Sequence, residues 1–157
     1  MDSYAVIKSL TRIIIMGNQE VTVDLNPDQD ALNFIENQLY AFNVATTQLP
    51  FGGFISCVIR DKQNAIIAGI HGYTWGIGCH IDYMWVDENQ RGQGYGSKLL
   101  EIIEAEALNR GCKLMVTETF SFQALPFYLK ANYEVTGKME GFPESPHENF
   151  FLKKVLK

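Results

Sequence analysis

Cysteine is scarce in this chain of 157 residues, and the three present, Cys57, Cys79 and Cys112, form no C-x-x-C pair. An odd number of widely spaced cysteines argues against a disulfide framework and against a thiolate metal site. Proline is also scarce, and no Gly/Ser/Pro-rich stretch divides the chain. The sequence therefore predicts one domain over residues 1–157 in a reducing cytoplasm, with residues 1–17 left unassigned.

Long hydrophobic runs are missing as well. No apolar run approaches the roughly 18 residues that span a bilayer, and the patch Ile13–Met16 is far shorter than the core of a signal peptide. The 13 Lys and Arg residues are outnumbered by 18 Asp and Glu residues and form no dense cluster. We therefore expect neither a membrane nor a nucleic acid as a partner.

Strand and helix signals alternate along the chain. Asn26-Pro27-Asp28 predicts a helix start, with Asn26 as the N-cap, and further helical patterns cover 94–110 and 122–130. Runs rich in Ile, Val and aromatic residues predict strands at 54–60, 65–75, 80–86, 113–117, 133–138 and 149–155. This order predicts a mixed α/β sheet with helices on both faces and antiparallel hairpins at one end.

A glycine-rich loop, Arg91-Gly92-Gln93-Gly94-Tyr95-Gly96, joins one of these strands to a helix. Alternating glycines free several backbone N–H groups to point at one anion, and the start of the helix adds the positive end of its dipole. The spacing matches neither the dinucleotide fingerprint G-x-G-x-x-G nor the triphosphate loop G-x-x-x-x-G-K-[ST]. The loop therefore predicts a pyrophosphate site, although an isolated match is also typical of a tight turn.

The stretch Asp87–Leu100, with the strand before it, resembles the R-x-x-G-x-G signature of the GNAT superfamily of N-acetyltransferases. The stretch Ala124–Tyr133 resembles the later helix of that superfamily, which commonly runs A-x-x-F-Y-x-K-x-G-[FY]. The resemblance covers about residues 20–157. It implies an N-acetyltransferase of the EC 2.3.1 class that uses acetyl-coenzyme A. It also implies a mixed, mostly antiparallel sheet of six to seven strands with a splayed central pair and helices on both faces.

The same resemblance implies which residues contact the cofactor. Backbone groups of an open strand would line its pantetheine arm, the loop would hold its pyrophosphate, and a tyrosine would lie near its sulfur. Ser121 stands where the superfamily often has an asparagine that contacts the pantetheine. The implied contacts are Met84, Trp85, Val86, Arg91, Gly92, Gln93, Gly94, Tyr95, Gly96, Ser97, Ser121 and Tyr128.

Direct acetyl transfer to an amine needs a base for the amine and an acid for the departing thiolate. Tyr128 occupies the position of the superfamily's frequent general acid, with packing beside Phe127 as the alternative. Asp82 is the first candidate for the base, because a carboxylate in mid-strand is costly unless it is paired or functional; the alternative is an acid that simply bonds His80. Glu118 is the second candidate, with a solvated strand end as its alternative.

Several weaker patterns complete the expectations. His80 and Asp82 share a strand face, but no third ligand has a diagnostic spacing, so we expect no metal. The acceptor is expected to be a primary amine of a small molecule or peptide, and superfamily habits suggest a homodimer. The alternatives are a sensor or interaction domain that binds acyl-coenzyme A without transferring the acyl group, and a scaffold. A group of aromatic residues is expected in the core rather than in an acceptor wall: Tyr73, Trp75, Tyr83, Phe120 and Phe122.

Overall fold

The computed structural model describes residues 12–24, 26 and 28–157. These residues fall into two compact units that divide after Gln48. The expectation of one domain over the whole chain therefore stays a prediction. A search of the described residues finds no helix that is both long enough and apolar enough to cross a membrane.

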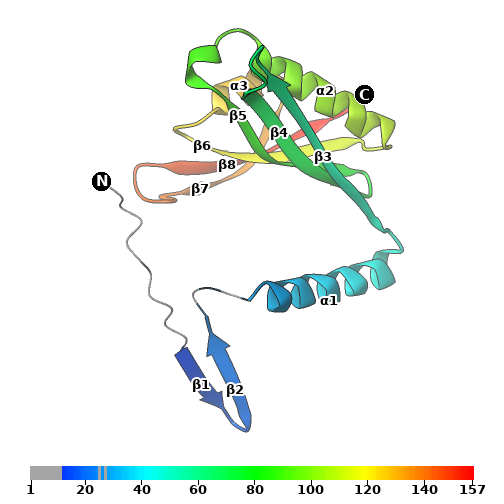
Figure 1. Ribbon diagram of the computed structural model, residues 1–157, viewed down its shortest axis with the longest axis vertical. Helices are drawn as coiled ribbons and strands as arrows, with labels where there is room; N and C mark the ends of the chain where they lie inside the picture. Colours follow the sequence, from blue (N-terminus) through cyan, green and yellow to red (C-terminus); the bar gives the residue numbers. More distant parts are fainter. Residues whose placement is uncertain (1–11, 25, 27) are drawn as a thin grey trace. The chain divides into compact units, whose positions relative to one another are not determined.

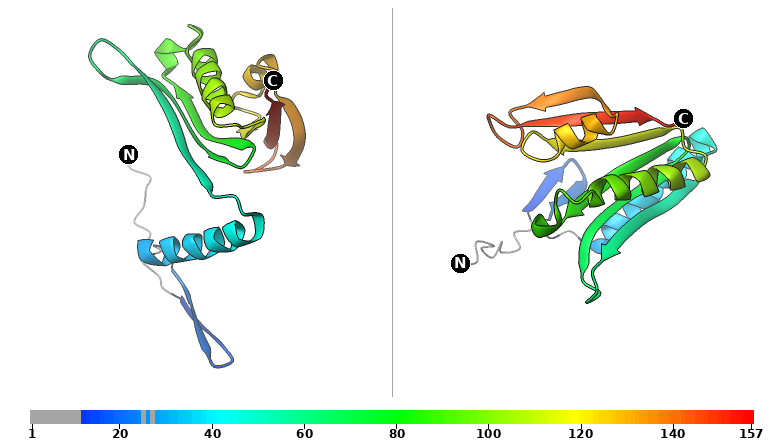
Figure 2. Two further views of the ribbon diagram at one scale, coloured as in Figure 1. Left: turned by 90° about the vertical axis from the view of Figure 1, so that its right-hand side faces the viewer. Right: turned by 90° about the horizontal axis from the view of Figure 1, so that it is seen from above.

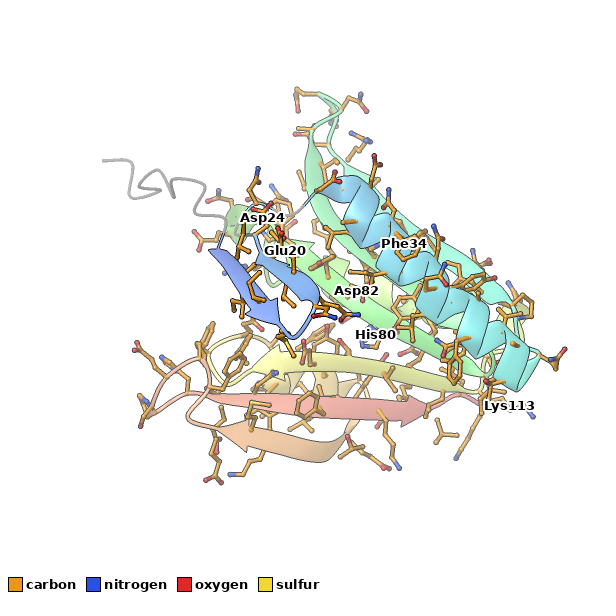
Figure 3. The ribbon with its side chains drawn as sticks, turned by 90° about the horizontal axis from the view of Figure 1, so that it is seen from below. Glu20, Asp24, Phe34, His80, Asp82 and Lys113 are labelled. Atoms are coloured by element: carbon orange, nitrogen blue, oxygen red, sulfur yellow. The ribbon has the colours of Figure 1, made fainter. Side chains whose placement is uncertain are left out.

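The first unit contains an antiparallel hairpin and one long helix. The hairpin pairs β1 (Arg12–Met16) with β2 (Gln19–Val23), and the helix is α1 (Gln29–Thr47). Strand β1 lies within the segment that the sequence left unassigned. Figure 3 shows Phe34, one of the exposed apolar residues of α1.

The start of α1 differs from the prediction. Its N-cap is Asp28, whose carboxylate accepts a hydrogen bond from the backbone N–H of Asp30 at 3.2 Å. The prediction of Asn26 as the N-cap was wrong, because the N-cap side chain must reach an amide two or three residues ahead within the first turn. Asn26 instead donates its own backbone N–H to the carboxylate of Asp24, and Pro27 lies outside the described residues.

The second unit is built on a six-stranded mixed sheet in the order β3-β4-β5-β6-β8-β7 (Figure 1). Neighbouring strands are antiparallel except for β5 and β6, which are parallel. This confirms the predicted mixed α/β sheet. Its strands are β3 (Phe51–Arg60), β4 (Ile66–Trp75), β5 (Gly78–Val86), β6 (Leu114–Phe120), β7 (Glu134–Glu140) and β8 (Glu148–Val155). A 3-10 turn η1 (Glu88–Gln90) and the helices α2 (Tyr95–Asn109) and α3 (Leu125–Lys130) complete the unit.

The hydrogen bonds explain why the end of β6 and the start of α3 differ from the predicted positions. Strand β6 continues to Phe120, beyond the predicted range 113–117, because it pairs with β8 over its whole length. Helix α3 begins at Leu125, three residues later than predicted. The side-chain oxygen of Gln123 instead accepts the backbone N–H of Phe120 at 3.0 Å, which holds the preceding segment as a turn.

One apolar core lies between the sheet and its two helices. Helix α2 packs on β3, β4 and β5 through Leu99 and Ile103, which are both fully buried. Burial of a side chain of this size contributes about 1.5–3 kcal/mol. Helix α3 adds Tyr128 to the same core. The expectation of helices on both faces involves α1 of the first unit and stays a prediction.

Strands β5 and β6 pair only where they begin. Their ladder runs from the pair Gly78–Leu114 to the pair His80–Val116, and beyond it the two strands diverge, as the right-hand view of Figure 2 shows. This confirms the predicted splayed central pair. The gap between the diverging strands positions the site described below.

A β-bulge in β5 lies directly at this point of divergence. His71 of β4 pairs with Tyr83 and Gly72 pairs with Ile81, so Asp82 is an extra residue without a partner on β4. The backbone at the bulge comes very close to β4: a Cβ atom on Gly72 would lie 2.0 Å from the carbonyl oxygen of His80. Only glycine fits there.

Candidate active site

The gap between β5 and β6 forms a cleft of about 920 Å³. Met84, Thr117 and Tyr128 line it from the side of the sheet that carries the helices, whereas Asp82 and Glu118 line it from the other side. The cleft therefore passes through the sheet between the two strands. All three predicted catalytic residues line it, as do these predicted cofactor contacts: Met84, Trp85, Val86, Arg91, Gly92, Gly94, Tyr95, Gly96, Ser97 and Tyr128.

The glycine loop has the geometry of an anion cradle. Gly92 (φ +76°) and Gly94 (φ +84°) adopt left-handed backbone conformations, which side chains other than glycine rarely adopt. Gly94 is the N-cap of α2, and its carbonyl accepts the N–H of Lys98 at 3.0 Å. The earlier amides of the first turn, at residues 95–97, have no intrahelical partner by construction. These amides border the cleft, so the loop fits a pyrophosphate.

Arg91 lies at the edge of this cradle. Its Nε donates to the carbonyl oxygen of Val86 at 3.2 Å, and one terminal nitrogen is 3.7 Å from the carboxylate of Glu88. An exposed ion pair of this length contributes little. The guanidinium can therefore exchange Glu88 for a phosphate while the bond to Val86 holds the arginine in place.

Two predicted cofactor contacts do not line the cleft. The side-chain amide of Gln93 donates to the carbonyl of Asn89 at 3.4 Å and to the side chain of Gln90 at 3.2 Å. The hydroxyl oxygen of Ser121 accepts the backbone N–H of Glu148 at 3.2 Å. Both side chains thus serve local structure here, and their contact with a cofactor stays a prediction.

Tyr128 is a buried phenol at the inner wall of the cleft. Its hydroxyl donates to the sulfur of Met84 at 3.8 Å. Burial raises the pKa of Tyr128 above its usual value, and the neighbouring polar side chain of Thr117 partly offsets this effect. The phenol therefore carries its proton at neutral pH, as a general acid must.

Asp82 lies between two histidines on the opposite side of the sheet. One carboxylate oxygen, Oδ1, is 2.9 Å from Nδ1 of His80, and the other, Oδ2, is 4.0 Å from Nε2 of His71. Figure 3 shows His80 and Asp82 next to each other on β5. Across the gap, Glu118 accepts a hydrogen bond from the side-chain amide of Asn149 at 2.9 Å. Two carboxylates thus border the cleft from β5 and β6.

No cluster of three metal-ligating side chains occurs within residues 12–24, 26 and 28–157. The expectation that five aromatic residues belong to the core was wrong for Tyr83, which is 74% exposed, for Phe122, which is 57% exposed, and for Trp75, which lies at the end of β4 and is 39% exposed. The bulge at Asp82 turns Tyr83 to the open face of the sheet, and Phe122 lies in the turn before α3 at the rim of the cleft.

Sequence reasoning missed Thr117. It lies at the narrow end of the cleft, and its hydroxyl donates to the carbonyl oxygen of Ile81 at 3.1 Å. A usable signal was present, because Thr117 and Thr119 follow the buried Met115 at intervals of two residues and so face the core. Polar residues on a buried strand face need a partner or a function.

Comparisons with known proteins agree with this geometry. The model of the acetyltransferase (GNAT) family matches residues 21–133. The chain is 30% identical over 95 residues to a blasticidin-S acetyltransferase of Streptomyces morookaense, a match that covers 60% of this chain and 70% of the relative. It is also 30% identical over 112 residues to an acetyltransferase of Agrobacterium fabrum, which covers 71% of this chain and 82% of the relative.

A solved structure extends the match beyond sequence. The crystal structure of an acetyltransferase from Bacillus cereus superposes with a TM-score of 0.73 at 34% identity, covering 83% of this chain and 95% of the other. The family match includes the glycine loop and the strands on either side of the cleft. The chain therefore belongs to the acetyltransferase (GNAT) family and is an N-acetyltransferase that uses acetyl-coenzyme A.

Proposed function

We propose that this enzyme moves the acetyl group of acetyl-coenzyme A directly to a primary amine of a small molecule or peptide. The observation that carries the proposal is the cleft through the sheet, which joins the glycine loop to the carboxylates of Asp82 and Glu118. Such a passage lets a donor held on one side of the sheet meet an acceptor that enters from the other. No covalent enzyme intermediate is needed.

The binding roles follow from the geometry. The free amides at the start of α2 and the guanidinium of Arg91 bind the pyrophosphate. Residues 84–86 lie beyond the last pair of the ladder with β6, so their backbone edge faces the gap and can bind an extended arm. The bound coenzyme supplies the activated thioester, and the residues of the chain supply orientation and proton transfer.

Asp82 is the proposed general base. Nδ1 of His80 lies 2.9 Å from Oδ1 of Asp82, whereas Nε2 of His71 lies 4.0 Å from Oδ2 of Asp82. Oδ2 is therefore the oxygen that can take the proton of the acceptor amine, directly or through a water. Glu118 is the second candidate, and its bond to Asn149 holds it at the other wall of the same opening.

Tyr128 is the proposed general acid, because its buried phenol keeps its proton and lies near the inner end of the gap. The acceptor would approach past the exposed ring of Phe122 at the rim, which stacks on the half-buried Phe120 at 5.2 Å and meets His147 edge-on at 4.9 Å. Two carboxylates beside these rings favour an acceptor that arrives as a cation. One relative is named for blasticidin S, so this compound belongs among the amines to be tested.

The proposal keeps two further predictions from the sequence, a cytoplasmic location and a homodimer. The competing proposal is a domain that binds acyl-coenzyme A as a sensor and transfers nothing. Retention of a phenol and two carboxylates at the opening favours the enzyme, since a sensor needs only the binding half of the cleft. The two proposals differ in whether thiol is released.

Calorimetric titration with acetyl-coenzyme A and a thiol-release assay against a panel of amines test the proposal. We expect binding, and release of thiol that depends on the amine. Asp82→Asn and Tyr128→Phe should each lower kcat about 100-fold or more while they leave cofactor binding within a few fold. Glu134→Gln, which removes an exposed carboxylate on β7, is the matched control. Binding without release for every amine would favour the sensor, and full activity of Asp82→Asn would transfer the role of base to Glu118.

A further inference from the structure

Asp82 lies where β5 has lost its ladder partners on both sides. It is the extra residue of the bulge, so it has no partner on β4, and the parallel ladder with β6 has already ended at the pair His80–Val116. A bulge leaves its extra residue without ladder hydrogen bonds. A general base must nevertheless hold its position closely, because a displacement of about 1 Å can cost about 100-fold in rate. The carboxylate of Asp82 therefore needs to be held by something other than the ladder.

His80, two residues before Asp82, is held from both sides. Its backbone pairs with Tyr73 on β4 and with Val116 on β6. Its imidazole stacks on the ring of Tyr73, with 5.3 Å between the ring centroids and 20° between the ring planes. Because neighbouring strands hold both the backbone and the ring, the sheet fixes the direction of the imidazole. Figure 3 shows His80 and Asp82 next to each other.

One hydrogen bond joins this firmly held residue to the bulge. Nδ1 of His80 lies 2.9 Å from Oδ1 of Asp82. An ionised carboxylate can only accept, so the shared proton lies on Nδ1 and His80 is the donor. A bond to an ionised acceptor is stronger than one between neutral groups. Nε2 of His71, at 4.0 Å from Oδ2, is too far away to donate, and no other side chain in the described part of the chain donates to Asp82.

We propose that His80 is a positioning residue for the general base. It holds the carboxylate of Asp82 by Oδ1 and thereby keeps Oδ2 at the opening between β5 and β6. When an N–H bond of the acceptor amine breaks, its proton forms an O–H bond at Oδ2 and the electron pair stays on the nitrogen. His80 keeps its Nδ1 proton throughout. Solvent removes the proton from Asp82 after the products leave.

His80 itself lies outside the place where the reacting atoms meet. The described residues that line the cleft include Asp82 but not His80. The imidazole instead lines a second hollow of about 390 Å³, together with Val116 and Glu118. Its side chain is 36% exposed, so water can reach Nε2. His80 thus acts through Asp82, in contrast to a histidine that takes the proton on its own Nε2 while an aspartate orients it.

This inference rests on the proposed role of Asp82, and two substitutions of equal shape test it. Leucine and asparagine are both branched at Cγ, but only asparagine carries an N–H donor there, as histidine does at Nδ1. We expect His80→Leu to lower kcat about 10- to 30-fold. This is the lower part of the effect of losing a hydrogen bond to a charged group, because both side chains are partly exposed. The KM for acetyl-coenzyme A should change less than about twofold, and the kcat of His80→Asn should stay within about fivefold of the wild type.

Two further variants show whether the effect passes through Asp82. His71→Leu is the matched control, because it removes an imidazole that lies beside the same carboxylate without a hydrogen bond to it. We expect its kcat to stay within about twofold of the wild type. In an Asp82→Asn background, His80→Leu should also change kcat by less than about twofold, because the base on which His80 acts is gone.

A second readout needs no turnover. Nitrogen-15 NMR reports which ring nitrogen of a neutral histidine carries the proton, and comparison with His80→Leu identifies the signals of His80 among the three histidines. We expect the proton on Nδ1 in the wild type, where the carboxylate accepts it. In Asp82→Ala, which removes the acceptor, the proton should divide between Nδ1 and Nε2. His80→Ala replaces His80→Leu in both readouts if the leucine variant does not fold.

The outcomes separate this inference from the proposed function. Equal losses of kcat in His80→Leu and His80→Asn would mean that the imidazole itself takes the proton, and would overturn the positioning role while the transfer of acetyl groups to amines stands. A proton on Nε2 in the wild type would overturn it as well. Full activity of Asp82→Asn would overturn the base role and this inference with it. Recovery in His80→Asn, together with a proton on Nδ1 that depends on Asp82, would support the inference.

Discussion

Gly94 and Gly111 offer a matched pair of substitutions for the anion cradle. Both have a backbone φ of +84°, and an added Cβ atom would meet nothing within 4 Å at either position. Gly94 is the N-cap of α2 and lines the cleft, whereas Gly111 follows the other end of the same helix and does not. Alanine at either position therefore imposes the same backbone strain without a clash, and only one of the two lies at the proposed pyrophosphate site.

The expected magnitudes differ between stability and binding. A left-handed conformation costs a residue other than glycine about 1–2 kcal/mol, and the stiffer unfolded chain returns about 0.4–1 kcal/mol. Each variant should thus lose about 1 kcal/mol, or about 2–4 °C of Tm for a chain of this length. In Gly94→Ala the relaxing loop should also turn at least one amide away from the phosphates. Loss of one charge-assisted hydrogen bond raises Kd about 10- to 100-fold.

Thermal unfolding and calorimetric titration with acetyl-coenzyme A measure the two quantities on the same protein samples. We expect similar losses of Tm in both variants and a raised Kd in Gly94→Ala alone. If Gly94→Ala loses stability as Gly111→Ala does but keeps its Kd within about twofold of the wild type, the loop is only a strand-to-helix turn. If both variants lose affinity equally, the effect comes from the stability of the helix and not from the cradle.

Two further predictions concern the core of the second unit. Ile103→Ala should lower the free energy of unfolding by about 2–5 kcal/mol because it opens a cavity under α2. Ile102→Ala, on the exposed side of the helix, should change it by no more than about 0.5 kcal/mol. Equal effects of the two variants in denaturant unfolding would contradict the described core. Burial, together with the carboxylate of Glu104, raises the pKa of Tyr133. The phenol of Tyr133 therefore binds fewer protons in the unfolded than in the folded state above about pH 10. It should add no pH dependence to stability below that pH and should lower stability above it. A free energy of unfolding that stays flat from about pH 10 to about pH 11.5 in urea titrations would refute the burial of this phenol.

The parts of the site that the sequence predicted are those encoded in short stretches. The loop Arg91–Gly96 is recognisable because its glycines alternate with other residues at the start of a helix, so the left-handed φ values and the free amides follow from local chemistry. The role of Tyr128 was predicted from a second local motif, the stretch Ala124–Tyr133. Even local reasoning failed at the start of α1, where Asn26 and Asp28 are both good caps and the choice depends on which side chain meets a free amide.

The contacts that complete the site join residues far apart in the chain. The bond from Thr117 to Ile81 spans 36 residues, the contact from Tyr128 to Met84 spans 44, and Asn149 reaches Glu118 over 31. Periodicity within one strand indicates that Thr117 faces inward but does not identify the carbonyl that it meets. That partner depends on where the ladder between β5 and β6 stops, which is a property of the whole sheet.

The bulge at Asp82 explains why the cleft has two chemically different sides. Before it, Cys79 and Ile81 of β5 face the core, which corresponds to odd positions. The extra residue shifts by one position the alternation of side chains between the two faces of the sheet. After the bulge, Met84 and Val86 therefore pack toward the core while Tyr83 lies on the open face. A strict period of two would have put Met84 on the open face, away from Tyr128. One inserted residue therefore brings Met84 to the phenol of Tyr128 and turns Tyr83 to the open face, on which Asp82 already lies.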